Sequence, residues 1–320
     1  MWAYRPNCKQ GRLLHCLRFK TKMPVRYRRA KPEEIPHVLR LLEPDRPLFS
    51  SSTWTALPQL LKDLLERERI LLCVIEGQDS HNLRFAGGSG FLTSTFLRAA
   101  LDHSTENILE LAFAAERAQQ PAFLNVKQVA AANRSGDLRP LMFFGTTGSL
   151  DPGDPKASIE MSLVLEAWNF FHRGFQFREV WAVTASAVQA EILNGTSLRL
   201  FRRGTTRSGA STWLFTISRE EALRNPAGWP NSHILSPLPI FRFTRTQQKL
   251  LELALLDYSD REAAIELQVS PDAVKKRWRS IYERVSQAEP ALFSHNVSGA
   301  DHRRLLLHRL RLNLAELRPY

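Results

Sequence analysis

The sequence predicts two folded parts, an α/β (or α+β) domain over residues 23–224 and an all-α domain over residues 241–289. Strand-like and helix-like patterns alternate through the first part, which is typical of an α/β protein. A segment with four prolines, residues 225–240, separates it from the second part, where three helix starts follow one another closely. With 43% hydrophobic and 24% charged residues, the chain can bury an ordinary core.

The N-terminal part opens with a short strand-like stretch at Val25, followed by a Pro-Glu-Glu helix start and apolar residues at helical spacing. Residues 69–77 and 85–95 predict two strands of a hairpin. Further strand, helix and strand patterns follow in PLMFFGTTG, IEMSLVLEAWNFFHRG and REVWAVTAS. The GGSG run at 87–90 lacks the Lys-Ser/Thr of a phosphate loop, so we interpret it as a bend or bulge in the hairpin.

This order of elements resembles the GNAT N-acetyltransferase fold, with a mixed sheet, over roughly residues 24–224. The resemblance implies a coenzyme A thioester held by a glycine-rich loop after the fourth strand. The matching segment, SLDPGDPKASIEM, has one glycine, Gly153, and two carboxylates, Asp151 and Asp154, where a pyrophosphate would lie. We therefore expect a non-catalytic sensor or interaction domain without a cofactor. The alternative is an active acyl-CoA-dependent N-acyltransferase.

Other candidate sites in the N-terminal part are weaker. His37, His103 and His172 are isolated in the sequence and show no pattern of nucleophile, base and orienting group. Cys8, His15 and Cys16 lack a fourth ligand at zinc-like spacing. We therefore predict no catalytic residue and no metal.

Three helix starts define the C-terminal part. Thr244 with Gln247 and Ser259 with Glu262 match the capping box, in which a hydroxyl caps the third backbone amide. Ser270 followed by a proline is a third start. The middle helix leaves only three or four residues for a turn, so the pattern predicts a helix-turn-helix.

On a helical wheel, the last helix separates an apolar side from a basic side. The side predicted to be buried holds Val274, Trp278, Ile281 and Val285. Lysine and arginine can donate to guanine O6 and N7 in the major groove of DNA. The DNA-binding residues that we predict are Lys275, Lys276 and Arg279 facing away from that side, Arg277 and Arg284 farther round, and Ser270 at the helix start.

The segment FTRTQQKLLELALLDYSDREAAIELQVSPDAVKKRWRSIYERV resembles the LuxR-type helix-turn-helix without gaps. The resemblance places the base-reading residues on Lys275, Lys276 and Arg279. It implies a bacterial transcriptional regulator that binds double-stranded DNA as a homodimer. Asp257 and Gln268 stand where the family has glycine, and we expect the second to strain the turn by about 1 kcal/mol. A sigma-factor domain is similar, but it would need a helical core-binding domain upstream.

The remaining features are consistent with a DNA-binding protein. The formal net charge is +12, which favours an anionic partner. Residues 1–22 hold six basic residues and no acid and predict a disordered tail, so Met23 is a second candidate start. Residues 290–320 predict a leucine-rich amphipathic helix that packs on its neighbours. Three scattered cysteines and the lack of a long apolar run predict a cytoplasmic protein away from membranes.

The main hypothesis is thus a non-catalytic regulator that senses a small-molecule or protein signal through its N-terminal domain. Two other function classes remain as alternatives. One is the N-acyltransferase tethered to DNA. The other treats both parts as protein-interaction modules, with the basic helix merely solvated.

Overall fold

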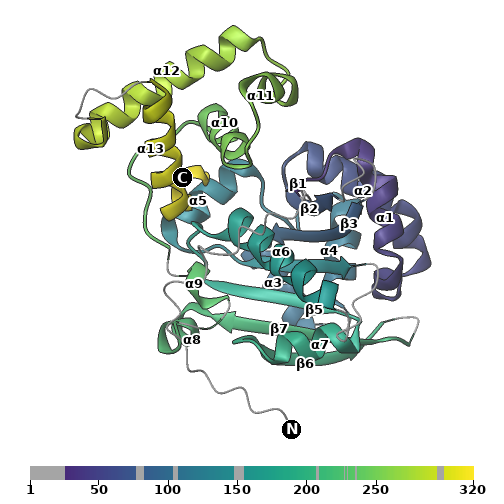
Figure 1. The fold of residues 1–320 in the computed structure, drawn as a ribbon. Helices are drawn as coiled ribbons and strands as arrows, with labels where there is room; N and C mark the ends of the chain where they lie inside the picture. The colour runs from purple at the N-terminus through teal and green to yellow at the C-terminus, as the bar shows by residue number, and fades with distance from the viewer. Residues whose placement is uncertain are drawn as a thin grey trace.

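The computed structural model describes residues 26–76, 83–103, 107–147, 155–206, 209–226, 228, 230–234, 236–293 and 299–320. Within them, one seven-stranded mixed sheet organises the N-terminal part (Figure 1). Its strands are β1 (Arg26–Arg29), β2 (Ile70–Glu76), β3 (Leu83–Phe91), β4 (Pro140–Thr147), β5 (Glu179–Thr184), β6 (Arg199–Thr205) and β7 (Ser211–Ser218). The predicted N-terminal tail, the candidate start at Met23 and the aspartates of the predicted cofactor loop lie outside the described residues.

The strand order is β1-β2-β3-β4-β5-β7-β6, and among these described strands only the β4–β5 pair is parallel. The predicted hairpin is confirmed, because β2 and β3 pair antiparallel from Ile70–Gly90 to Glu76–Leu83. The bend or bulge predicted in the glycine run of the hairpin was wrong for β3 itself, because residues 87–90 pair with β2 in unbroken register. The irregularity lies opposite them in β4, which has one residue more than β3 between the partners of Gly87 and Gly88. A Cβ on Gly90 would meet the ring of Phe123 at 2.5 Å, so close packing requires glycine there.

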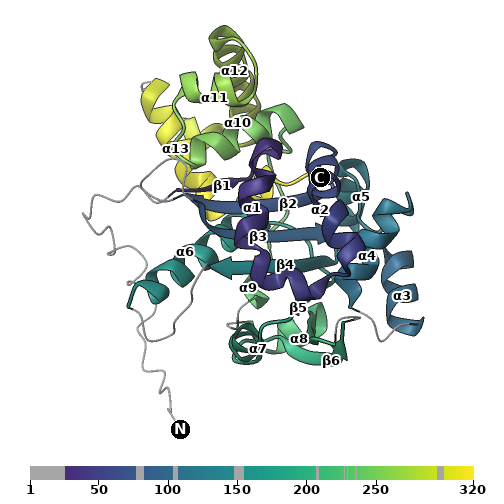
Figure 2. The same ribbon diagram turned by 90° about the vertical axis from the view of Figure 1, so that its right-hand side faces the viewer.

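Helices cover both faces of this sheet (Figures 1 and 2). One face packs against a cluster that includes Val38, Leu57, Leu61 and Phe113. The helices of the N-terminal part are α1 (Ile35–Leu41), α2 (Ser51–Glu66), α3 (Ser94–His103), α4 (Ile108–Arg117), α5 (Val126–Ser135), α6 (Pro155–His172), α7 (Ala187–Asn194) and α8 (Arg219–Arg224). Helix α6 lies against β1 and β2.

Helix α9 (Asn231–Ile234) packs against α8, and its Ile234 joins an apolar cluster with Val180 of β5 and Phe215 of β7. The helices that follow lie beside the β1 edge of the sheet in both views (Figures 1 and 2). They are α10 (Arg245–Leu255), α11 (Asp260–Glu266), α12 (Pro271–Ala288) and α13 (Gly299–Leu312), followed by a 3-10 turn at Leu314–Leu317. Their apolar cluster also contains Cys73 of β2 and Phe170 and Phe171 of α6. The structure thus shows helices that share a core with the sheet, and not a distinct all-α domain.

The proline-rich segment between the two parts contacts both. The backbone N–H of Gly174 donates to Ser236 Oγ at 2.9 Å, and Gln176 Nε2 donates to the Ser236 carbonyl at 2.6 Å. On the other side, Glu316 accepts hydrogen bonds from the N–H groups of Ile240, at 2.5 Å, and Phe241, at 3.0 Å. Buried polar groups with such partners hold a segment in one conformation.

None of the described helices combines the length with the apolar composition that crossing a bilayer demands. Within the same residues, no group of three His, Cys, Asp or Glu side chains is arranged to hold a metal ion.

Candidate functional site

The α11–α12 pair begins with the predicted caps. Ser259 Oγ accepts from the Glu262 N–H at 3.3 Å, while Glu262 accepts from the Ser259 N–H at 2.7 Å. Ser270 Oγ accepts from the Ala273 N–H at 3.2 Å, at the first turn of α12. A residue whose side chain caps an otherwise unpaired amide fixes where the helix begins. The Ser259 cap therefore fixes the start of α11, and the Ser270 cap fixes where the turn between the two helices ends.

Gln268 lies in that turn with φ 52°, which confirms the left-handed conformation expected at this position. Asp257, in the preceding turn, also has a left-handed backbone with φ 62°. The expectation of strain at Gln268 alone was therefore incomplete, since both positions hold a non-glycine residue where glycine is favoured.

Helix α12 has the predicted two sides. Val274, Trp278, Ile281 and Val285 are buried, as the wheel predicted. Lys275, Lys276 and Arg279 are exposed, and Lys275 makes only a surface ion pair with Asp272 at 3.3 Å. Figures 1 and 2 show α12 on the outside of the molecule, with α10 between it and the sheet. Three cationic side chains are thus presented on a rigid, capped helix.

Two of the six predicted DNA-binding residues lie elsewhere. Arg277 is half-buried and lines a crevice between the helices and the sheet. Arg284 is also half-buried and donates to the Arg242 carbonyl at 3.3 Å. Because these arginines point toward the rest of the chain, the outward basic face is narrower than the sequence suggested.

Helix α13 packs on α10, as predicted for the leucine-rich extension, and its buried Leu306 and Leu310 join the apolar cluster of the C-terminal helices. Its Arg303 donates to Asp260 at 2.8 Å and lies 4.4 Å above the Trp278 ring. Trp278 Nε1 donates to the same carboxylate at 3.1 Å. Arg303 therefore fixes the helices relative to one another.

A second candidate site lies where β4 and β5 separate. Within the described strands, these neighbours pair only at Leu141–Trp181 and Met142–Ala182. Beyond those positions β4 continues to Thr147, and the register shift against β3 falls in the same stretch. Diverging parallel strands leave backbone donors and acceptors that an extended ligand can pair with. The aspartates that would decide on pyrophosphate binding are outside the described residues.

The structure also joins two residues that the sequence left apart. Ser89 Oγ of β3 lies 2.6 Å from His172 Nε2 at the end of α6, and both residues are buried. His172 Nδ1 lies 3.1 Å from the Trp168 carbonyl and its ring stacks on Trp168. His172 is isolated in the sequence, as stated above, but in the fold it has a side-chain partner. Local sequence patterns could not predict this contact, because the two residues are 83 positions apart.

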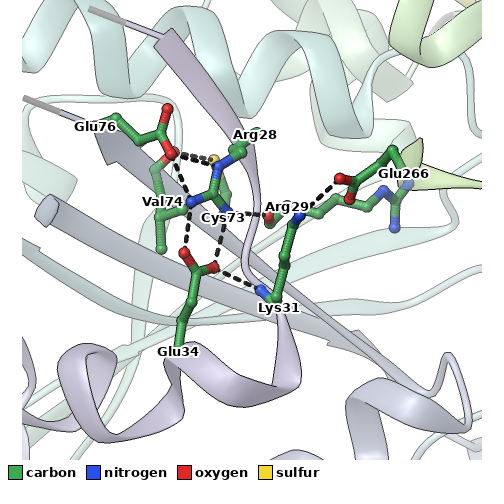
Figure 3. A network of polar contacts seen from close by, with 8 residues as sticks. All are labelled: Arg28, Arg29, Lys31, Glu34, Cys73, Val74, Glu76 and Glu266. Carbon is green, nitrogen blue, oxygen red and sulfur yellow. Dashed lines mark hydrogen bonds and ion pairs between the residues drawn. The ribbon is translucent and has the colours of Figure 1, made fainter. Parts of the chain in front are cut away.

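The edge strand β1 carries a polar network that ties the two parts together (Figure 3). The Arg28 guanidinium lies between Glu34, at 2.5 Å, and Glu76, at 2.6 Å. Lys31 reaches across to Glu266 of α11 at 2.6 Å. An ion pair between elements far apart in sequence fixes their relative position when it is partly buried.

No family model and no curated protein matches the chain. Among solved structures it is similar to an agmatine N-acetyltransferase, with 14% identity, a TM-score of 0.37, and coverage of 61% of this chain and 99% of that one. It is similar to a polyamine N-acetyltransferase of Drosophila melanogaster, with 14% identity, a TM-score of 0.36, and coverage of 61% and 99%. It is also similar to an N-acyl amino acid synthase from uncultured soil microbes, with 10% identity, a TM-score of 0.36, and coverage of 62% and 95%.

These structures are acyl-transferring enzymes by name, and the likeness is one of fold. With TM-scores below 0.5 it carries no conclusion about substrate or activity. What the chain itself defines is a mixed α/β sheet with a C-terminal group of helices docked on its edge.

Proposed function

We propose that the protein binds double-stranded DNA through a helix-turn-helix formed by α11 and α12. The observation that carries this proposal is the exposed trio Lys275, Lys276 and Arg279, which lies opposite a fully buried stripe on one capped helix. A helix that is anchored on one side and cationic on the other fits the major groove, where these side chains can donate to base edges. In such a complex the protein acts as a transcriptional regulator, as a dimer on a two-fold site.

Selection of bound sequences from random DNA, carried out at two salt concentrations, tests this proposal. We expect a consensus site, and a loss of about 1–3 kcal/mol in binding free energy for each of Lys275→Ala and Arg279→Ala. Arg98→Ala, which removes an exposed arginine on α3, is the matched control and should leave the affinity unchanged. Wild-type affinity and preference in both α12 variants would contradict the proposal. A steep salt dependence of the affinity without a consensus sequence would show that the protein binds only the phosphate backbone of DNA.

For the N-terminal part, the separation of β4 and β5 favours acyl transfer over a purely non-catalytic sensor. The pantetheine arm of an acyl-CoA is an extended chain with two amides, and it can hydrogen-bond to the backbone of β4 beyond Met142. The bulge in β4 supports this role, because a bulge redirects backbone groups out of the ladder. The second candidate function is thus an acyl-CoA-dependent N-acyltransferase carried on DNA by its helix-turn-helix.

Calorimetric titration of the full chain with acetyl-CoA and with a longer acyl-CoA separates these readings. Micromolar binding supports the acyltransferase, and its absence supports a sensor that has lost the cofactor. The Lys275→Ala variant serves as the control, since it should lose DNA affinity and keep any acyl-CoA affinity. A parallel loss of both would mean that the variant is misfolded, which circular dichroism would reveal.

A further inference from the structure

A crevice of about 540 Å³ runs between the sheet edge and helices α10–α12. It is lined by residues of β1, β2, β3, α5, the end of α6, α10 and the C-terminal turn. Its volume falls in the range of sites for small molecules. The crevice touches the end of β3 at Ser89–Phe91, which pairs with the first residues of β4. It is therefore separate from the place where the last residues of β4 leave β5.

Positive charge predominates in the lining. Three carboxylates line the crevice, namely Glu68, Glu252 and Glu266. Three more pair with lining arginines from outside, Glu34 and Glu76 with Arg28 and Glu116 with Arg69. The cationic lining residues are Arg28, Arg29, Lys31, Arg69, Arg245, Lys249, Arg277 and Arg318. Eight cations face six carboxylates in all, so the crevice attracts an anion.

Arg318 is the lining residue on which we place an incoming anion. It is 1% exposed, its Nε donates to the Arg173 carbonyl at 2.9 Å, and its Nη2 donates to the Phe170 carbonyl. Among the described residues no carboxylate lies within ion-pair distance of it. Burial lowers the pKa of Arg318 to about 9, although Glu252 nearby opposes the shift. Because Glu252 acts on Arg318 only from beyond ion-pair distance, this buried cation gains from an incoming anion.

Two further buried donors lie in the same lining. The Nε atoms of Arg69 and Arg245 are buried and have no acceptor in the described structure. Buried donors are nearly always paired, so these unpaired Nε atoms leave the surroundings of the crevice with more hydrogen-bond donors than acceptors.

Apolar side chains stand next to these cations. The Arg318 guanidinium lies 5.2 Å above the Phe175 ring, and Phe171, Phe91, Val129 and Leu317 line the crevice beside it. Because a cationic anchor adjoins an apolar wall, we propose that the crevice binds a small amphipathic carboxylate, with its carboxylate on Arg318 and its alkyl chain against Phe171 and Phe175. Such a molecule would be the signal of the proposed regulator, and that link alone rests on the proposed function.

Calorimetry on the full chain without DNA tests the site independently of any DNA binding. Octanoate is the probe, octanol its uncharged control and inorganic phosphate its compact-anion control. We expect octanoate to bind with one site per chain and the two controls to bind at least about tenfold more weakly. Absence of octanoate binding, or equal binding of either control, would overturn the proposal.

Two variants locate the binding. Arg318→Met should weaken octanoate about tenfold or more, because a charge-assisted hydrogen bond is lost. Val126→Trp, at a half-buried lining position of α5, should obstruct the crevice without removing a buried contact, so it tests the site even if Arg318→Met does not fold. Lys127→Trp, exposed on the same helix outside the lining, is its control and should bind normally. Octanoate binding unaffected by Val126→Trp would place the ligand elsewhere and refute the assignment.

Discussion

Arg29 of β1 donates two hydrogen bonds to Glu252 of α10, at 2.5 Å from Nε to Oε1 and at 2.9 Å from Nη2 to Oε2. The carboxylate is buried, whereas the Arg29 side chain remains 41% exposed. A bidentate pair of this kind is the strongest form of arginine–carboxylate contact, and it joins the sheet to the C-terminal helices.

Removing Arg29 should therefore destabilise the protein. We expect Arg29→Met to lower the free energy of unfolding by about 2 kcal/mol, because Glu252 is left buried without its partner. Urea unfolding measures the loss. In the double variant with Glu252→Gln, part of that loss should be recovered, which gives a coupling energy of about 1 kcal/mol. Additive effects would show that the pair does not stabilise the docking.

The contact between the sheet and the C-terminal helices could not be predicted from the sequence, although the elements that make this contact could. The strand, the helix starts and the buried stripe of α12 depend on neighbours a few residues apart, so local patterns predicted them. Arg29 and Glu252 are 223 residues apart, and Ser89 and His172 are 83 apart. Nothing near either partner marks the other, since such contacts arise only when the chain packs.

The separation of β4 from β5 after Met142 shows the same limit of sequence-based prediction for the second candidate site. The sequence predicted β4 and β5 as strands, and the resemblance suggested a sheet of this kind. The place where they cease to pair depends on the twist and the bulge of the folded sheet. A strand pattern does not encode it.

Glu68 should make stability depend on pH in the acid range. Burial alone would raise the pKa of Glu68, but the nearby Arg245 and Lys249 outweigh it and lower the pKa from 4.5 to about 2. A carboxylate with a depressed pKa contributes stability above its unfolded pKa and loses it as the pH falls through the folded value. The contribution should therefore disappear between about pH 4.5 and pH 2.

Urea unfolding of Glu68→Gln at several pH values checks this expectation. The variant should be less stable than the wild type at pH 6, and the two should converge as the pH falls toward about 2. Glu43→Gln removes an exposed carboxylate paired with Arg46, so it should differ little from the wild type throughout. A gap between wild type and Glu68→Gln that stays constant with pH would contradict the argument.

Glycine in place of either of the two left-handed residues of the C-terminal turns should stabilise the protein. Gln268 has φ 52° and Asp257 has φ 62°. Relief of the steric cost exceeds the extra entropy that glycine loses on folding, so Gln268→Gly should stabilise the protein by about 0.5–1 kcal/mol. Asp257→Gly should gain less, because aspartate tolerates this conformation better.

The control is the same glutamine-to-glycine substitution in a regular helix. Gln59→Gly, at an exposed position of α2, should destabilise the protein by about 1 kcal/mol. Thermal unfolding of the variants gives the signs directly. If Gln268→Gly were as destabilising as Gln59→Gly, the strain inferred for the turn would be absent.

Gly174 tests how closely the C-terminal turn is seated on the sheet domain. Its φ is 101°, and a Cβ there would lie 2.5 Å from the backbone N of Ala315 and the carbonyl carbon of Leu314. Because backbone atoms cannot move aside, Gly174→Ala should lower the free energy of unfolding by about 3 kcal/mol or more and loosen the C-terminal turn.

Gly209→Ala is the matched control: its φ is 83°, but nothing lies within 4 Å of the added carbon. That variant should lose only about 1 kcal/mol from backbone strain. Hydrogen exchange should then show faster exchange in residues 314–317 for Gly174→Ala alone, and equal effects of the two variants would mean that the turn is not held by this contact.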